Sequence, residues 1–262
     1  MPDIPQTECR EAIALRAAGK AFALDDGGSV VALDGIDISI REGEFVAILG
    51  PSGCGKSTVL RLVAGLETAT SGTVHIEGRA PAELAAHHRL GVAFQDHALL
   101  PWLSVSDNVA LPFRVARKPV ARDTIARLIA LVGLSGFENA RPSQLSGGMR
   151  QRASIARALA LDPDVLLLDE PFGALDAVTR RHMNIELQRI WSARTLTTVL
   201  VTHSVEEALF LADRIIVMTG RPGRVLRDVA VPFARPRTPE ALRTAQFHAM
   251  VDDLTRALEP QG

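Results

Sequence analysis

The chain has 262 residues and a mass of 28.1 kDa, which is long enough for one large domain or two small ones with a substantial core. Its 29 Lys and Arg residues almost balance its 30 Asp and Glu residues, and the formal net charge of −1 argues against a general nucleic-acid-binding protein. No apolar run approaches the roughly 20 residues of a membrane-spanning helix, and no basic segment followed by an apolar one opens the chain as a secretory signal.

The first part of the chain has the apolar pattern of β-strands. We expect strands over residues 30–33, 36–40, 45–49 and 73–76, and a turn over residues 19–28. A glycine-rich segment closes the run 45–49, and apolar residues at helical spacing follow over 57–66. Strand, glycine loop and helix therefore succeed one another within a mixed β region.

The middle of the chain is predicted to be helical. Apolar residues recur at helical spacing over residues 124–132 and 148–161, and four prolines mark breaks between segments: Pro101, Pro112, Pro119 and Pro142. We therefore expect a helical subdomain over approximately residues 96–160.

The β pattern then returns and alternates with helices. We expect strands over 165–168, 198–201 and 215–217, with helices over 178–191 and 205–212. Continuous apolar strands that alternate with helices indicate a parallel sheet buried on both faces. A short C-terminal extension, approximately residues 220–262, carries a predicted helix that starts at Thr238 as N-cap, with Pro239 in its first position.

Residues 50–57 fit the pattern of Gly, four residues, Gly, Lys and Ser or Thr that holds a nucleoside triphosphate. Glycines allow backbone N–H groups to face the phosphates, Lys56 supplies a charge for the β- and γ-phosphates, and the Ser57 hydroxyl would bind Mg²⁺. The alternative is an incidental glycine-rich turn, in which Cys54 merely fills a position. The predicted ATP-binding residues of this segment are Gly50, Pro51, Ser52, Gly53, Cys54, Gly55, Lys56, Ser57 and Thr58.

Two carboxylates follow the apolar strand 165–168. Asp169 is placed to bind Mg²⁺, and Glu170 to orient and polarise the water that attacks the γ-phosphate. Taken alone, the pair could equally be an ordinary solvated strand end. Its combination with the glycine loop favours the catalytic interpretation.

Residues 145–152, Leu-Ser-Gly-Gly-Met-Arg-Gln-Arg, stand before a helix and resemble the signature of the ATP-binding-cassette (ABC) family. Further family motifs follow the same order, with Gln95 after a short apolar run, an Ala-Leu-Asp loop at 174–176, and His203 after the strand 198–201. The resemblance covers about residues 22–223, and Met149 stands where many members have Gln. It implies one α/β ABC ATPase domain of the P-loop NTPase type over residues 1–262, with a RecA-like mixed-sheet core, an N-terminal antiparallel β region and an inserted helical subdomain.

The resemblance also implies roles for individual residues. Ser146, Gly147 and Gly148 would complete the ATP site of a second cassette in a head-to-tail homodimer, and Asp176 would contribute to ATP binding. Gln95 would contact Mg²⁺ and the attacking water, and His203 the γ-phosphate, although a lone histidine is often a core residue. Phe22 would stack on adenine, with Phe45 as an alternative that we expect to be buried. The implied catalytic residues are Glu170, His203 and Gln95, the implied metal ligands are Ser57, Gln95 and Asp169, and the cofactors are ATP and Mg²⁺.

Residues 98–109 and 221–224 are similar to segments in cassettes of importers for nitrate, aliphatic sulfonates and taurine. This similarity implies integral-membrane permease subunits as partners, an extracytoplasmic solute-binding protein as an indirect partner, and a peripheral position on the cytoplasmic face of the inner membrane. Trp102 would dock on the permease or belong to the core. Two cysteines, Cys9 and Cys54, cannot form a disulfide framework, which agrees with a reducing cytoplasm.

Two other functions remain as alternatives. A soluble cassette ATPase of DNA repair, translation or iron–sulfur assembly fits the length and spacing less well. A kinase or GTPase would leave residues 145–152 unexplained.

Overall fold

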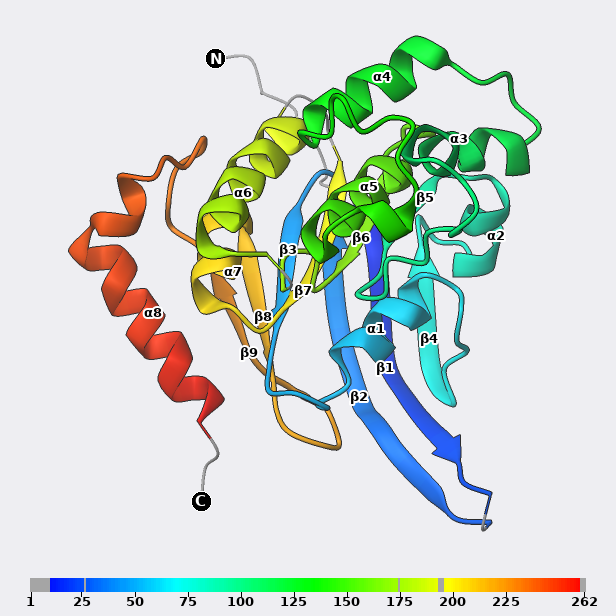
Figure 1. Ribbon diagram of the computed structural model, residues 1–262. Helices are drawn as coiled ribbons and strands as arrows, with labels where there is room; N and C mark the ends of the chain where they lie inside the picture. Colours follow the sequence, from blue (N-terminus) through cyan, green and yellow to red (C-terminus); the bar gives the residue numbers. More distant parts are fainter. Residues whose placement is uncertain (1–9, 26, 174, 193–195, 260–262) are drawn as a thin grey trace, which may run out of the picture.

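The computed structural model describes residues 10–25, 27–173, 175–192 and 196–259, so Cys9 and Ala174 lie outside the described residues. Two sheets form its framework (Figure 1). The smaller sheet has the antiparallel order β2-β1-β4, with strands β1 (Glu11–Ala23), β2 (Ser29–Arg41) and β4 (Ser71–Ile76). The larger sheet has the order β5-β6-β7-β3-β8-β9.

The larger sheet is parallel except for its edge strand β9. Its strands are β5 (Leu90–Ala93), β6 (Val165–Asp169), β7 (Thr197–Thr202), β3 (Phe45–Leu49), β8 (Arg214–Met218) and β9 (Val225–Ala230). Both faces are buried, because Phe45 and Ala47 contribute to one apolar cluster and Val46 and Ile48 to the other. The predicted parallel sheet, buried on both sides, is therefore confirmed.

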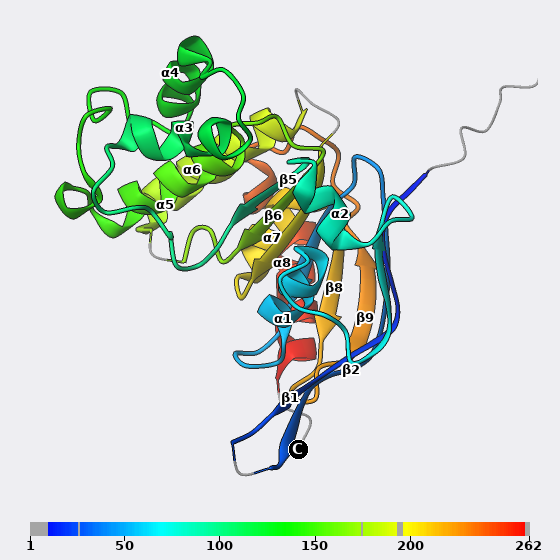
Figure 2. The same ribbon diagram turned by 90° about the vertical axis from the view of Figure 1, so that its right-hand side faces the viewer.

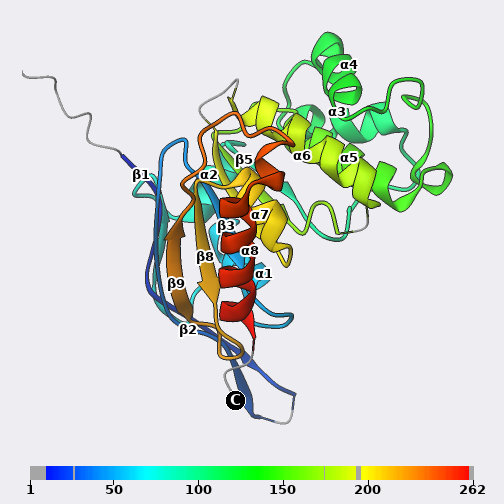
Figure 3. The same cartoon turned by 90° about the vertical axis from the view of Figure 1, so that its left-hand side faces the viewer.

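Helices cover both faces of this sheet. Helix α1 (Lys56–Val63) packs in the apolar cluster between the two sheets, and α2 (Pro81–Ala86) contributes Leu84 to it. The opposite face carries α3 (Val105–Val115), α4 (Arg122–Leu131), η1 (Pro142–Gln144), α5 (Gly147–Ala158), α6 (Ala177–Ser192), α7 (Val205–Leu211), η2 (Ala241–Arg243) and α8 (Ala245–Leu258). Figure 2 shows α3 and α4 on the side away from β1 and β2, and Figure 3 shows α8 beside β8. Among the described helices, none is long and apolar enough to cross a membrane.

The N-terminal sheet departs from the sequence prediction. Strand β1 was not predicted, the predicted strands 30–33 and 36–40 are parts of the single strand β2, and the predicted turn 19–28 belongs to β1 as far as Ala23. Irregular register between β1 and β2 interrupts the alternation of apolar and polar residues that identifies a strand. Glycine at position 19 of β1 leaves room for the neighbouring strand β4, because a Cβ atom there would lie only 2.4 Å from Ser71 Oγ.

Three predicted helix boundaries are wrong. Helix α5 ends at Ala158, with Leu159 as its C-cap, and not at residue 161. Helix α1 ends at Val63, not at residue 66, because Gly65 adopts a φ of 70° and turns the chain out of the helix. The C-terminal helix begins after Thr244, whose hydroxyl accepts a hydrogen bond from the backbone N–H of Phe247 at 3.2 Å. Thr238 does not start this helix, because a turn and η2 follow it. The preceding residue, Arg237, is held by hydrogen bonds: its backbone N–H donates to the Gln188 side chain, and its buried guanidinium donates to the Ala212 carbonyl.

Candidate functional site

The glycine-rich loop joins β3 to α1, and its conformation depends on glycine. Gly53 has a φ of 75° and Gly55, the residue before α1, a φ of 101°. A Cβ atom at Gly55 would lie 2.6 Å from Leu33 Cδ2 and 3.0 Å from the Ala32 carbonyl oxygen. Other residues would therefore be strained and crowded at this position, so the loop that precedes the N-terminus of α1 is sterically specified.

Lys56 is held at the centre of the loop. Its side chain is buried, and Nζ donates hydrogen bonds to the carbonyl oxygens of Gly50 at 2.7 Å and Pro51 at 3.0 Å. A fixed ammonium group therefore lies where the loop meets the helix. Burial raises the pKa of the neighbouring Cys54 thiol, although the charge of Lys56 opposes the rise. Cys54 is thus a buried, protonated loop residue rather than a reactive thiol.

Ser57 and Asp169 meet beside the loop. The Ser57 hydroxyl lies 3.0 Å from Asp169 Oδ1, and Asp169 ends β6 with only 4% of its surface exposed. Burial raises the pKa of Asp169, the Ser57 hydrogen bond opposes this, and the charge of Glu170 adds to the rise. A hydroxyl and a carboxylate are oxygen ligands of the kind that Mg²⁺ prefers, so the residues present fit this ion.

Glu170 and His203 form a second polar pair. Glu170 has a φ of 45°, rare for a residue with a side chain, and its N–H donates to the Val201 carbonyl at 2.8 Å. His203 Nδ1 lies 3.2 Å from Glu170 Oε2, and more than half of the His203 side chain is exposed. His203 is therefore not the core histidine that the sequence left open.

A cavity of about 390 Å³ brings these groups together. Its lining consists of Phe22, Ala32, Ser52, Gly53, Gly55, Lys56, Ser57, Thr58, Gln95, Glu170 and Arg221. All but Ala32 and Arg221 are residues that the sequence analysis assigns to the site. Asp169 and His203 each contact a residue that lines the cavity: Asp169 is hydrogen-bonded to Ser57, and His203 is paired with Glu170. Residues that lie far apart in the sequence thus share one polar space.

The cavity also distinguishes the two aromatic candidates. Phe45 is completely buried within β3, whereas Phe22 is half-buried and lines the cavity. Lys20 Nζ lies 5.0 Å from the centre of the Phe22 ring, a cation–π contact. Only Phe22 of this pair can reach a ligand in the cavity.

The ABC transporter family matches residues 33–173, more than half of the chain. The chain belongs to this family. It is 45% identical over 229 residues to the nitrate import ATP-binding protein NrtD of Synechococcus elongatus, covering 86% of the chain and 82% of that protein. It is 42% identical over 226 residues to the aliphatic sulfonates import ATP-binding protein SsuB of Bacillus subtilis, covering 86% and 87%.

Solved structures agree with this fold. A dimeric bacterial ABC transporter cassette superposes with a TM-score of 0.78 at 32% identity, covering 85% of the chain and all of that structure. The post-hydrolysis state of an ATP-binding cassette bound to ADP and Pi gives a TM-score of 0.77 at 33% identity, with the same coverage. The predicted α/β ABC ATPase fold, with its mixed core sheet and antiparallel N-terminal sheet, is therefore confirmed.

The signature segment of this cassette lies apart from the cavity. Ser146 caps α5, where its hydroxyl accepts a hydrogen bond from the Met149 N–H at 3.2 Å. A Cβ atom at Gly148 would lie 2.4 Å from Leu175 Cδ2, so this glycine allows the loop before α6 to approach closely. Of the described residues that line the cavity, none comes from the predicted set Ser146, Gly147, Gly148 and Asp176.

Asp176 has a local structural role in the cassette. Its Oδ1 accepts hydrogen bonds from the N–H groups of Val178 and Thr179, each at 3.0 Å, at the start of α6. The Thr179 N–H in particular lowers the pKa of Asp176. Asp176 is thus a charged residue that caps the start of α6.

Sequence reasoning missed three residues of the site region. Ala32 and Arg221 line the cavity, and Glu207 of α7 lies buried nearby, with only 4% of its surface exposed. The Arg-Pro-Gly-Arg segment 221–224 gives only a resemblance to importer cassettes in the sequence, and no signal of a place in the site. Two adjacent glutamates in the first turn of α7 give no signal that one is buried and the other exposed.

Burial of Glu207 predicts a dependence of stability on pH. Desolvation raises its pKa to about 7 from an ordinary value of 4.5, whereas the Thr202 hydroxyl and the charge of Arg180 oppose the rise. Between these values the folded chain holds a proton that the unfolded chain releases, so the free energy of unfolding decreases as pH rises from about 4.5 to about 7. The loss is on the order of 3 kcal/mol.

We expect Glu207→Gln to reduce this dependence, because an amide does not titrate. Denaturant unfolding of the variant and the wild type at pH 5 and pH 8 measures the difference. Glu206→Gln is the matched control, since Glu206 is the exposed neighbour. An equal decrease in stability for wild type and Glu207→Gln between the two pH values would contradict the assignment.

Proposed function

We propose that the chain is the ATP-hydrolysing subunit of an ABC importer and binds ATP with Mg²⁺ in the cavity beside the glycine loop. The observation that carries this proposal is the cavity itself, which unites Lys56, Ser57, Gln95 and Glu170 from separate elements. The similarity to ATP-binding proteins of nitrate and aliphatic sulfonate importers supports transport as the coupled process.

Each group has a chemical role in this proposal. Lys56 and the N-terminus of α1 bind the β- and γ-phosphates. Ser57, Asp169 and Gln95 would hold Mg²⁺, which when bound would neutralise negative charge on the phosphates. Glu170 accepts a proton from the attacking water and orients it, and His203, at 3.2 Å from Glu170, positions that carboxylate and contacts the γ-phosphate.

A second copy of the chain would complete the site. The N-terminus of α5, with Ser146, Gly147 and Gly148, presents backbone N–H groups outside the cavity, and Asp176 lies at another exposed helix start. In a head-to-tail homodimer these groups would face the γ-phosphate bound by the partner cassette. The similarity to a dimeric ABC transporter cassette supports this arrangement.

The proposed assembly follows the chain's organisation. Residues 1–262 form a single ABC ATPase domain, approximately residues 96–160 form the helical subdomain, and approximately residues 220–262 form the C-terminal extension. The helical subdomain would couple nucleotide binding to an integral-membrane permease, and the extension would remain part of the ATPase domain.

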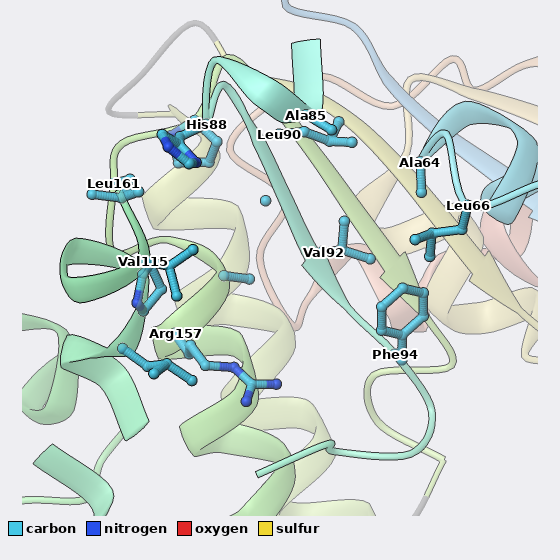
Figure 4. A pocket seen from close by; sticks show the side chains of 15 residues that line it. Ala64, Leu66, Ala85, His88, Leu90, Val92, Phe94, Val115, Arg157 and Leu161 are labelled. Atoms are coloured by element: carbon cyan, nitrogen blue, oxygen red, sulfur yellow. The ribbon is translucent and has the colours of Figure 1, made fainter. Parts of the chain in front are cut away.

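An apolar groove is the proposed docking site for the permease. It has a volume of about 380 Å³ and lies between β5, α3 and α5 (Figure 4). Leu66, Val92, Phe94, Val115 and Leu161 line it. Phe94 is followed directly by Gln95, so a permease segment in the groove would lie one residue away from the nucleotide cavity.

Trp102, which is outside the lining of the groove, is a second proposed contact with the permease. It is 66% exposed, which excludes the alternative that it belongs to the core. Buried Asn108 fixes the loop that carries it: the amide accepts a hydrogen bond from the Leu100 N–H at 2.8 Å and donates to the carbonyls of Leu100, Leu103 and Ser104. An aromatic ring exposed on a fixed loop is typical of an interface anchor.

The proposed solute is nitrate, a sulfonate, taurine or a related small solute, because the relatives with these printed functions share most of the chain. The extracytoplasmic solute-binding protein would act only through the permease. We place the chain on the cytoplasmic face of the cell membrane as a peripheral subunit. A soluble cassette of DNA repair, translation or iron–sulfur assembly is the alternative, and co-purification with an integral-membrane partner distinguishes the two.

Trp102→Ala tests the docking surface in the purified complex. We expect roughly 30-fold weaker binding to the permease and loss of permease-stimulated ATP hydrolysis and solute uptake, while the basal activity of the isolated chain persists. Phe137→Ala is the control, because it truncates another exposed aromatic ring, 44% exposed, on the loop after α4 rather than on the loop before α3. Unchanged uptake would place the docking surface elsewhere. An equal loss of basal and stimulated activity, with lower thermal stability, would make Trp102 a structural residue.

A further inference from the structure

The turn between β8 and β9 lies against the glycine loop, as Figure 1 shows. The N–H of Gly223 donates a hydrogen bond to the Ala32 carbonyl at 2.9 Å, and the Asp34 N–H donates to the Gly223 carbonyl at 3.0 Å. A Cβ atom at Gly223 would lie 2.1 Å from the Cys54 carbonyl oxygen. Only glycine allows this approach, so the turn is fitted closely to the loop that holds the phosphates.

Hydrogen bonds within the turn fix its shape. The Thr219 N–H donates to the Arg224 carbonyl at 2.9 Å, and the Thr219 hydroxyl accepts a hydrogen bond from the Arg224 N–H at 3.0 Å. The Arg224 guanidinium forms an ion pair with Asp34 of β2. The turn is thus tied to β2 at Gly223 and at Arg224, and Arg221 extends from a fixed backbone.

The two arginines of this turn differ in their surroundings. Arg224 is paired with Asp34, whereas no described residue accepts a hydrogen bond from the Arg221 guanidinium or forms an ion pair with it. Arg221 is exposed and lines the cavity that contains Lys56 and Glu170. A guanidinium group available in a binding cavity is a donor for a ligand.

The position of the turn indicates which part of a nucleotide Arg221 can reach. Phe22 of β1 is paired with Val30 of β2, two residues from Ala32. Phe22 and Ala32 both line the cavity, and Gly223, two residues from Arg221, is hydrogen-bonded to Ala32. Arg221 therefore enters the cavity beside the wall formed by β1 and β2, where an aromatic ring is available for the base.

We infer that Arg221 is a nucleotide-binding residue that contacts the nucleoside end of ATP, together with Phe22. This inference rests on the proposed function. The planar guanidinium stacks on a purine or donates hydrogen bonds to ring nitrogens and ribose oxygens. Lys56 and the backbone of the glycine loop serve the phosphates, so the two basic residues of the cavity have separate tasks.

Calorimetric titration with ATP, ADP and inorganic tripolyphosphate tests this division. We expect Arg221→Ala to weaken ATP and ADP binding by the same factor, roughly tenfold, and to leave tripolyphosphate binding unchanged. Arg221→Lys keeps the charge without the planar group and should recover only part of the affinity. Arg224→Ala is the matched control, because it removes an equal charge from the same turn while the backbone hydrogen bonds of Gly223 to Ala32 and Asp34 still hold the turn against β2.

The outcomes separate this inference from the proposed function. If the wild type binds ATP and Lys56→Ala does not, but Arg221→Ala binds ATP as the wild type does, the assignment of Arg221 alone is overturned. Equal weakening of ATP and tripolyphosphate binding, fully rescued by Arg221→Lys, would also overturn it, because Arg221 would then serve the phosphates. Absence of ATP binding by the wild type would instead contradict the proposed function.

Discussion

Lys56→Ala is expected to weaken ATP binding by about 10- to 100-fold, since a hydrogen bond to a charged group contributes about 1.5–3 kcal/mol. The ammonium group lies between the Gly50 and Pro51 carbonyls at the centre of the loop and is largely buried. An alanine leaves no cation there, and its short side chain cannot reach a phosphate. Calorimetric titration with ATP measures the loss, and hydrolysis should disappear with it.

Lys118→Ala provides the control for Lys56→Ala, because Lys118 is an exposed lysine after α3 and does not line the cavity. Thermal unfolding of both variants shows whether the loop is intact, since removal of Lys56 also takes hydrogen bonds from two carbonyls. A folded Lys56→Ala chain with wild-type affinity for ATP would rule out the phosphate-binding role of the loop.

The central sheet was predictable because its strands are buried on both faces. Strands such as β3 and β6 appear in the sequence as uninterrupted apolar runs, and the segments between the strands have their apolar residues at helical spacing. Strand β1 escaped prediction because its irregular register with β2 breaks the alternation, and Gly19 looks like a turn residue although it permits close approach of Ser71. Long-range pairing, absent from any local pattern, determines this strand.

The same distinction applies to the candidate site. The glycine loop directly follows β3, and the adjacent residues Asp169 and Glu170 stand at the end of β6, so a short motif predicts each of them. Arg221 enters the cavity through a hydrogen bond between Gly223 and Ala32, two residues far apart in the sequence. Nothing in the local sequence indicates that contact. Burial of Glu207 likewise depends on how α7 packs, and its exposed neighbour has the same side chain.

Glu170→Gln is expected to slow ATP hydrolysis by about 10²- to 10³-fold while ATP remains bound, because an amide keeps the shape of the side chain but cannot accept the proton of water. The carboxylate lines the cavity, and its Oε2 lies 3.2 Å from His203 Nδ1. Its backbone is fixed in an unusual conformation by the hydrogen bond to Val201, so the substitution should not move the main chain. ATP-dependent dimers of the variant should therefore persist, and light scattering in the presence of ATP and Mg²⁺ measures them.

Glu206→Gln makes the same chemical change on an exposed residue outside the cavity and should retain wild-type turnover. Normal turnover by Glu170→Gln would remove Glu170 from the catalytic role, and loss of ATP binding would show that its carboxylate serves the ground state instead.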